Sequence, residues 1–508
     1  MGTTLIRASL ALVAIMAAAS VAFYFGNGRV FACGSAGPFD FDTYEVESYV
    51  NAYNTAIELA ATGQAITTTT TLSNGEVVDV RYQGLKSGPR TARIAENKSI
   101  RIPPSIYKAI VWIETGSFNN ASKSVYYGGV GPVIRSPDCG YGLGQITTGM
   151  SNSTGKATAK QAIVGSHYLY NLAEGARILA DKWDSAPKFR PIAGTGNPAA
   201  LEDWYFAIWS YNGFAFSNHP LNPDLDPLRG GAAPSPIYHC QDTTAQSYQA
   251  AGGIPKFGYN DYTYPERVYG CMRNPPTPVP QPGGVATKLA KPQTFLMPDF
   301  SNEVIAKAFD VKNFLTCEDA GFSGGCPLMD YPTTIPAKGV TTHTDSTPAV
   351  NPALAAQILG APRLAISGPT AANFTISSGG TVNSVTVTVA NNGSSIGPYV
   401  VRASSPWIIV RHPGEPASRT IDGGVALGKE MSVVVGAGLR QSGYSSTLQV
   451  TVNPSAIPKG TTTGKLTIEP LLGGGAPYTM DITVTGTGSG GPAYDHRQLI
   501  GGLSSDRK

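Results

Sequence analysis

The sequence predicts a multidomain protein in which a mainly helical domain is followed by an all-β domain. Apolar residues recur at helical spacing from Ile106 to Ile113, and again within 171–183 and 201–211. Near the other end, Val385, Val387 and Val389 alternate with polar residues, as in a half-buried strand. A proline-rich stretch at 274–284 separates the two patterns. A chain of 508 residues is long enough for two or three such domains.

The N-terminal stretch 1–32 is predicted to be a signal peptide or a membrane anchor. An uncharged apolar run at 8–25 follows Arg7. The run is long for a signal-peptide core and barely long enough to span a bilayer, so both interpretations stay open. Either one predicts an exported protein, extracellular or at the cell surface.

Residues 33–94 form a region of unclear role. Within it, 44–59 has the spacing of an amphipathic helix, and Asn74-Gly75 predicts a hairpin turn.

Composition excludes several function classes. Charged residues make up 14% of the chain and the formal net charge is +3, which is too small to indicate a nucleic-acid partner. The six histidines are scattered, and no Cys-x-x-Cys spacing occurs. We therefore expect no metal site and no cofactor.

Glu114 is the best candidate for a catalytic acid. It lies near the end of a helix that is predicted to start around Ser105, which we expect to be the cap residue. Ile110 and Val111 lie one turn back, so the carboxyl sits beside the apolar stripe. Apolar neighbours and the negative end of the helix dipole both favour the protonated form of a carboxyl. A general acid working near neutral pH needs that form.

Four motifs follow one another in the segment 95–275. They are Glu114-Thr-Gly-Ser-Phe118, Gly142-Leu143-Gly144-Gln145-Ile146, Tyr211-Asn212-Gly213 and Tyr264-Pro-Glu-Arg267-Val268. In this order they resemble the lytic transglycosylase domain of the soluble type, a relative of goose-type lysozyme. The resemblance implies a mainly α, lysozyme-like catalytic domain from a bacterial protein that acts on peptidoglycan glycan strands.

The resemblance also implies roles for individual residues. Glu114 would be the catalytic acid/base, and Gln145 would hydrogen-bond the sugar chain beside a cleft lined by Gly142 and Leu143. Tyr211 and Asn212 would support the carboxylate and the N-acetyl groups, and Tyr264 would lie close to Glu114.

The sequence departs from the family pattern at two positions. Gly144 stands where the family usually has methionine, which we expect to change the shape of a sugar subsite. Glu114 is followed by a segment one residue longer than the common Ser-x-Phe spacing.

The six cysteines of an exported chain are expected to form disulfides. Cys240 and Cys271 flank the last motif of the catalytic segment, and we pair them. Cys317 and Cys326 are close enough for a local bridge, which leaves Cys139 to pair with Cys33 or to stay free. Sequence spacing does not fix this connectivity.

The remaining chain divides into a Pro/Thr-rich linker region at 276–357, a β-sandwich at 358–487 and a disordered tail at 488–508. Ser404-Ser-Pro-Trp407-Ile408 and the segment 452–460 resemble the immunoglobulin-like modules of bacterial surface enzymes. The paired cysteines of antibody domains are absent, so Trp407 is predicted to pack in a disulfide-free core. The partner of this module is unknown.

Three functions compete at this point. A lytic transglycosylase needs one acid/base, and the muramic acid hydroxymethyl oxygen closes onto its own anomeric carbon. A lysozyme-like muramidase would need a second carboxylate to activate water, for which Asp138 is the candidate. A non-enzymatic wall-binding surface protein would rely on the β module. The single clear acid favours the first.

Overall fold

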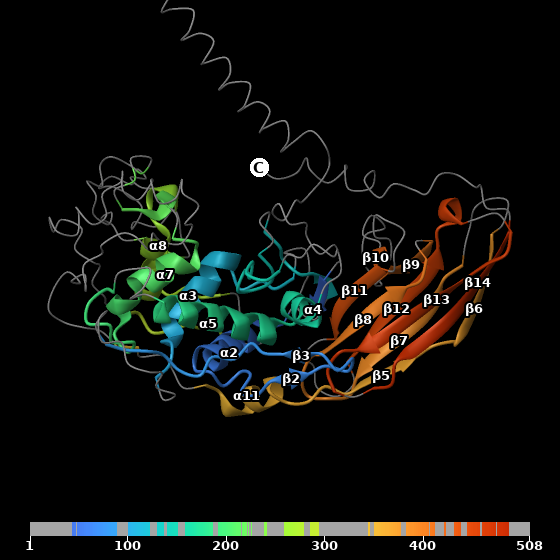
Figure 1. Cartoon of the computed structure of the whole chain (residues 1–508), viewed down its shortest axis with the longest axis horizontal. Helices are drawn as coiled ribbons and strands as arrows, with labels where there is room; N and C mark the ends of the chain where they lie inside the picture. Colours follow the sequence, from blue (N-terminus) through green and yellow to red (C-terminus); the bar gives the residue numbers. More distant parts are fainter. Residues whose placement is uncertain are drawn as a thin grey trace, which may run out of the picture.

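The computed structural model describes residues 43–46, 48–88, 100–121, 130–136, 140–150, 158–185, 192–214, 216–220, 222, 225, 238–240, 259–278, 285–293, 344–345, 350–376, 383–405, 407–411, 421–422, 431–437, 444–457, 460–473 and 475–486. Figure 1 shows a helical part, mostly blue to green, beside a β part in orange and red. The chain therefore combines helices and β-sheets, as the sequence predicts.

The helical part is built around α3 and α5, which carry long buried faces. Its helices are α2 (Val50–Ala61), α3 (Pro104–Thr115), α4 (Ala159–Ser166), α5 (Tyr168–Asp184), α7 (Tyr205–Tyr211), α8 (Tyr264–Arg273) and α11 (Pro352–Ile358), with the 3-10 turns η1 (Leu201–Trp204), η2 (Phe216–Asn218) and η5 (Tyr259–Asp261). α3 contacts α2 and α8, and α5 contacts α2, α4 and α7. Trp183 stacks on Trp204 with ring centroids 4.4 Å apart, and both are buried. Burial of such large rings stabilises the core that holds α3 in place.

Two local expectations for the helices are wrong. Ser105 does not cap α3: the cap position is Pro103, and Ser105 lies inside the first turn. The amide of Ser105 donates instead to Asp345 Oδ2 at 2.9 Å, so a carboxylate from far along the chain satisfies that helix end. The helix expected at 44–59 is split, because Thr43–Val46 form strand β1 and the helix starts only at Val50.

The Asn74-Gly75 hairpin is confirmed. β2 (Thr70–Thr71) pairs antiparallel with β3 (Val77–Val78), and Gly75 has φ 85°. A left-handed turn residue of this kind is what the Asn-Gly pair supplies.

The β part consists of two sheets whose buried faces share one core. The strands are β4 (Val130–Pro132), β5 (Leu364–Ser367), β6 (Ala371–Ile376), β7 (Val385–Asn391), β8 (Gly397–Ala403), β9 (Ile408–Arg411), β10 (Ile421–Asp422), β11 (Met431–Ala437), β12 (Tyr444–Val452), β13 (Thr462–Pro470) and β14 (Tyr478–Gly486). One sheet has the order β4-β1-β11-β8-β13-β14-β6, and the other β10-β9-β12-β7-β5. Alternating residues of both sheets meet inside, among them Val387, Leu448, Ile468 and Ile482. Trp407 lies in this core with 4% exposure, which confirms its predicted packing.

The helical and β parts are joined by several contacts. β1 pairs in parallel with β11, α4 contacts β11, and Ser73 N donates to Leu471 O at 3.1 Å. His167, between α4 and α5, hydrogen-bonds the backbone of Ile396, and its burial lowers its pKa to about 3. The imidazole at this junction is therefore neutral at pH 7.

Described residues of the stretch predicted to be a linker also pack on the helical part. Lys108 Nζ donates to Leu289 O at 3.0 Å, and Thr344 forms a bridge with Ala200. Figure 1 places α11 beside α2, in agreement with their contacts. These segments therefore lie on the helical core instead of extending away from it.

Several predictions fall outside the described residues: the apolar run 8–25, Cys33, Cys139, Asp138, Cys317, Cys326 and the tail 488–508. Within the described part of the chain, no helix has the length and apolar character needed to cross a bilayer.

Candidate active site

Glu114 is the penultimate residue of α3 and is half-buried. The helix ends at Gly116, whose φ of 70° lets its amide reach back to Trp112 O at 2.7 Å. Thr115 Oγ1 donates to Val111 O and accepts from the amide of Phe118, each at 2.9 Å. Phe118 is fully buried with φ 56° and packs edge-on against Trp112. The longer segment after Glu114 is therefore folded into two left-handed residues and fixed by Thr115.

Tyr264 brings the last motif onto this carboxyl. Its hydroxyl donates to Glu114 Oε1 at 2.5 Å, and the tyrosine is only 2% exposed. Tyr264 is the first residue of α8, which begins with a capping box between Thr263 and Glu266. Burial, followed by the charge of Glu114, raises the pKa of Tyr264 well above its usual value. The phenol therefore stays protonated and remains a donor.

Asn218 connects the third motif to the fourth, a role that the sequence did not indicate. Its Nδ2 donates to Asn212 Oδ1 at 2.8 Å, and its Oδ1 accepts from the amide of Tyr264 at 2.8 Å. Asn218 is buried, while Asn212 is exposed at the end of α7. Asn218 thus connects Asn212, at the surface, to the backbone of the tyrosine that hydrogen-bonds Glu114.

The glycine turn of the second motif is held by Asn171, on α5. Asn171 Oδ1 accepts from the amide of Gly144 at 2.7 Å, and its Nδ2 donates to Tyr141 O at 2.7 Å. Gly142 has φ 66°, and a Cβ there would come within 2.8 Å of the Asn171 amide. Glycine is needed at this position for both reasons. A buried asparagine inside a helix was the one available signal for this role.

Tyr211 ties the same turn to the helices beneath it. Its hydroxyl donates to Gly144 O at 2.8 Å. A Cβ on Gly144 would meet Ile146 at 3.0 Å and the Tyr211 hydroxyl at 3.4 Å. A side chain at position 144 would therefore point into the protein interior. The sequence had instead led us to expect that Gly144 changes the shape of a sugar subsite.

Gly175 of α5 provides the room in which two tyrosine hydroxyls meet. A Cβ there would come within 2.3 Å of the Tyr107 hydroxyl and 2.9 Å of the Tyr211 hydroxyl. Tyr107 donates to Leu172 O at 2.7 Å. Burial raises the pKa of both tyrosines well above the usual value, and the charge of Glu114 adds to it. The phenols of Tyr107, Tyr211 and Tyr264 are therefore all neutral, and that of Tyr264 donates to Glu114.

The two remaining residues of the glycine turn differ in exposure. Gln145 is half-buried with φ 46°, and its Nε2 donates to Gly142 O at 2.7 Å. Leu143 is fully buried in the helical core, so any contact that it makes with a sugar would use its backbone.

Glu174 is the carboxylate next to Gly175, and it is neutralised by cations. Lys160 Nζ lies 2.8 Å from Oε1 and Arg177 Nε lies 2.8 Å from Oε2. Although burial raises the pKa of Glu174, these hydrogen bonds outweigh it and leave the pKa below its usual value. Glu174 is thus a paired anion and not a second proton donor. Asp138, the candidate for a second carboxylate, lies outside the described residues.

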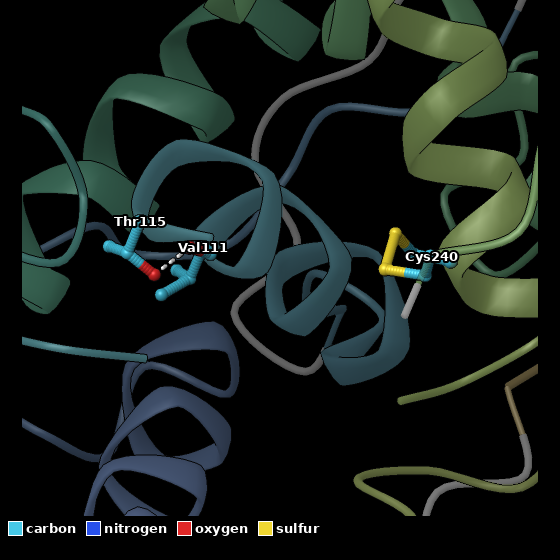
Figure 2. The surroundings of a disulfide bond; sticks show 4 residues. Val111, Thr115 and Cys240 are labelled. Atoms are coloured by element: carbon cyan, nitrogen blue, oxygen red, sulfur yellow. Dashed lines mark hydrogen bonds between the residues drawn. A yellow bond between two sulfur atoms is a disulfide. The ribbon is translucent and has the colours of Figure 1, made fainter. Parts of the chain in front are cut away.

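The Cys240–Cys271 disulfide is confirmed, and it fastens α8 near the site. The two Cα atoms lie 4.6 Å apart, and Cys271 is in the last turn of α8. Figure 2 shows this bond together with the Thr115–Val111 hydrogen bond on α3, the helix that α8 contacts. Among the described residues, no group of histidine, cysteine and carboxylate side chains is arranged to hold a metal ion.

No family model and no curated protein matches this chain. Solved structures that match include the CooA pilin subunit from enterotoxigenic Escherichia coli, at 16% identity, covering 25% of this chain and 98% of that chain, with TM-score 0.16. The periplasmic chaperone SfaE matches at 12% identity over 24% of this chain and 57% of its own, with TM-score 0.15. The fimbrial subunit AggA from Escherichia coli matches at 13% identity over 25% and 95%, with TM-score 0.14. Scores this low carry no conclusion about fold or function.

Proposed function

We propose that this protein is a peptidoglycan lytic transglycosylase and that Glu114 is its general acid/base. The observation that carries the proposal is the hydrogen bond from Tyr264 to Glu114, because it joins the first and last motifs around one half-buried carboxyl. Tyr211 and Asn171 bring the glycine turn to the same group of side chains. All four motifs that resemble the transglycosylase family thus converge. We further propose that the helical part has a lysozyme-like fold and that the sandwich is immunoglobulin-like.

The reaction needs only one proton-transfer group. Glu114 gives its proton to the glycosidic oxygen between N-acetylmuramic acid and N-acetylglucosamine, and the bond to the muramic acid anomeric carbon breaks. The carboxylate then takes the proton of the C6 hydroxyl of the same muramic acid, and that oxygen bonds to the anomeric carbon. The product is a 1,6-anhydromuramyl end, water is not consumed, and Glu114 returns to its starting protonation state. Tyr264 holds the carboxyl in one orientation during both transfers.

Export is part of the proposal, since peptidoglycan lies outside the cytoplasm. The Cys240–Cys271 disulfide supports it, because such bonds persist in oxidising compartments.

Mass spectrometry of the products from purified peptidoglycan tests the reaction. The full-length protein should release anhydromuramyl ends without incorporating oxygen from labelled water. Glu114→Gln should lower the rate by about 10²–10⁴, the usual loss on removal of a general acid/base. Near-normal activity of Glu114→Gln would reject the role of Glu114. Reducing-end muramic acid as the main product, together with an inactive Asp138→Asn variant, would establish the muramidase instead.

A further inference from the structure

Arg267 lies between the acid-binding tyrosine and an exposed aromatic ring. Its guanidinium carbon is 4.1 Å from the ring centroid of Tyr259 and 5.9 Å from that of Tyr264. Tyr264 is the residue whose hydroxyl donates to Glu114, so the cation is one aromatic ring away from the proposed acid. Tyr259 is 43% exposed, which places this cation at the surface beside the site.

This pair of side chains has a rigid support. The ring of Tyr238 packs edge-on against Tyr259 at 5.9 Å and against Tyr262 at 5.4 Å. The Cys240–Cys271 disulfide fixes the segment that carries Tyr238 to α8. A Cβ at Gly270 would come within 2.4 Å of Tyr238 O, so this backbone lies directly on the helix.

Arg267 has a hydrogen-bond donor without an acceptor and no carboxylate partner among the described residues. Its Nε is buried without a hydrogen-bond partner, and no described carboxylate lies within ion-pair distance of its guanidinium. A buried donor without a partner normally costs stability, so such a group calls for an explanation. The guanidinium carbon lies over the ring of Tyr259, a cation–π contact that places no oxygen acceptor on the N–H edge of the guanidinium. That edge is the part which binds a carboxylate with two parallel hydrogen bonds.

We propose that Arg267 and Tyr259 form a subsite for a carboxylate of the peptide stem that peptidoglycan carries on muramic acid. The inference rests on the proposed function, because the sugar next to the cleaved bond is the one that bears the stem. Arg267 binds the carboxylate, and the ring of Tyr259 holds the guanidinium in place. The enzyme therefore prefers strands that still carry their stems.

The test compares two soluble glycan substrates, one with intact peptide stems and one from which an amidase has removed them. The full-length protein and its Arg267→Met variant are assayed on both. In Arg267→Met, kcat/KM on stem-bearing strands should fall at least about tenfold more than on stem-free strands, mainly through KM, as expected for one charge-assisted pair. Arg267→Lys keeps the charge without the planar fork and should recover only part of the loss. Arg402→Met, on a half-exposed arginine of β8, is the matched control and should change neither rate.

An equal loss on both substrates would overturn the subsite, because Arg267 would then act only through Tyr264. No loss on either substrate would overturn it as well. Binding of a stem-bearing disaccharide and of its stem-free form to the same variants, measured by calorimetry, separates the two proposals. If the wild-type protein cleaves neither strand but binds the stem-bearing form in an Arg267-dependent way, the proposed function fails and the subsite stands. If Arg267→Met binds both forms like the wild type, the subsite is refuted whatever the activity.

Discussion

Replacing Tyr264 by phenylalanine removes one hydroxyl from the site and leaves the ring in place. That hydroxyl is buried and donates to Glu114 Oε1 at 2.5 Å. In the proposed mechanism Glu114 becomes negatively charged as its proton leaves in the transition state, and a hydrogen bond to such a charged partner contributes about 1.5–3 kcal/mol. At about 1.4 kcal/mol for each factor of ten, the rate of glycan cleavage should fall roughly 10- to 100-fold. Because Glu114 is half-buried, water can replace the lost donor, and we expect thermal stability to change little.

The chain offers a matched control in the same helix. Tyr269 is also a buried tyrosine of α8, and its hydroxyl donates to Leu201 O at 2.5 Å, away from Glu114. Tyr269→Phe should lower the unfolding free energy by about 1 kcal/mol while the rate stays unchanged. Steady-state kinetics on soluble glycan strands and thermal melting of both variants measure the two effects. If Tyr264→Phe cleaved at the wild-type rate, or if both variants lost equal activity, Tyr264 would have no special role in orienting Glu114.

Three further predictions concern other buried polar groups. Asn218→Ala should lower kcat about tenfold, because it removes the acceptor that positions the amide of Tyr264. Burial raises the pKa of Asp203 from 3.8 to about 6, so the folded state holds this proton more tightly than the unfolded state does. Urea unfolding should therefore show about 3 kcal/mol of stability lost as the pH rises from about 4 to about 6. Asp203→Asn should remove that pH dependence. Lys108→Met should cost about 3–5 kcal/mol by leaving Glu58 buried without its ion pair, and the double change with Glu58→Leu should recover most of it.

Each of these predictions has an outcome that would contradict it. A KM effect alone in Asn218→Ala would make Asn218 a substrate contact and not a positioning residue. An unchanged pH profile in Asp203→Asn would mean that another group titrates between pH 4 and 6. A double variant as unstable as Lys108→Met would show that lost packing, and not the unpaired charge, explains the cost.

Local patterns were sufficient to find the proposed acid, Glu114, and the fourth motif, whose Tyr264 hydrogen-bonds it. Glu114 stood out because it follows an apolar stripe, and Tyr264 because of its place in the motif order. Asn218 and Gly175 could not be found this way, since neither belongs to a local pattern. Asn218 gains its role only because η2 lies beside the start of α8, and Gly175 only because α5 crosses two tyrosines.

Helix and strand positions in this chain depend mainly on short-range spacing, and the sequence alone was therefore enough to divide it into helical and β parts. It also placed the Asn74-Gly75 hairpin and paired Cys240 with Cys271. The sequence alone did not predict the contacts between segments that are far apart in the chain. Thr43–Val46 join a sheet formed almost four hundred residues later, and Asp345 satisfies the amide of Ser105 at the start of α3. Backbone N–H and C=O groups at strand edges and helix ends can pair with many different partners, so only the tertiary structure decides which partner is present.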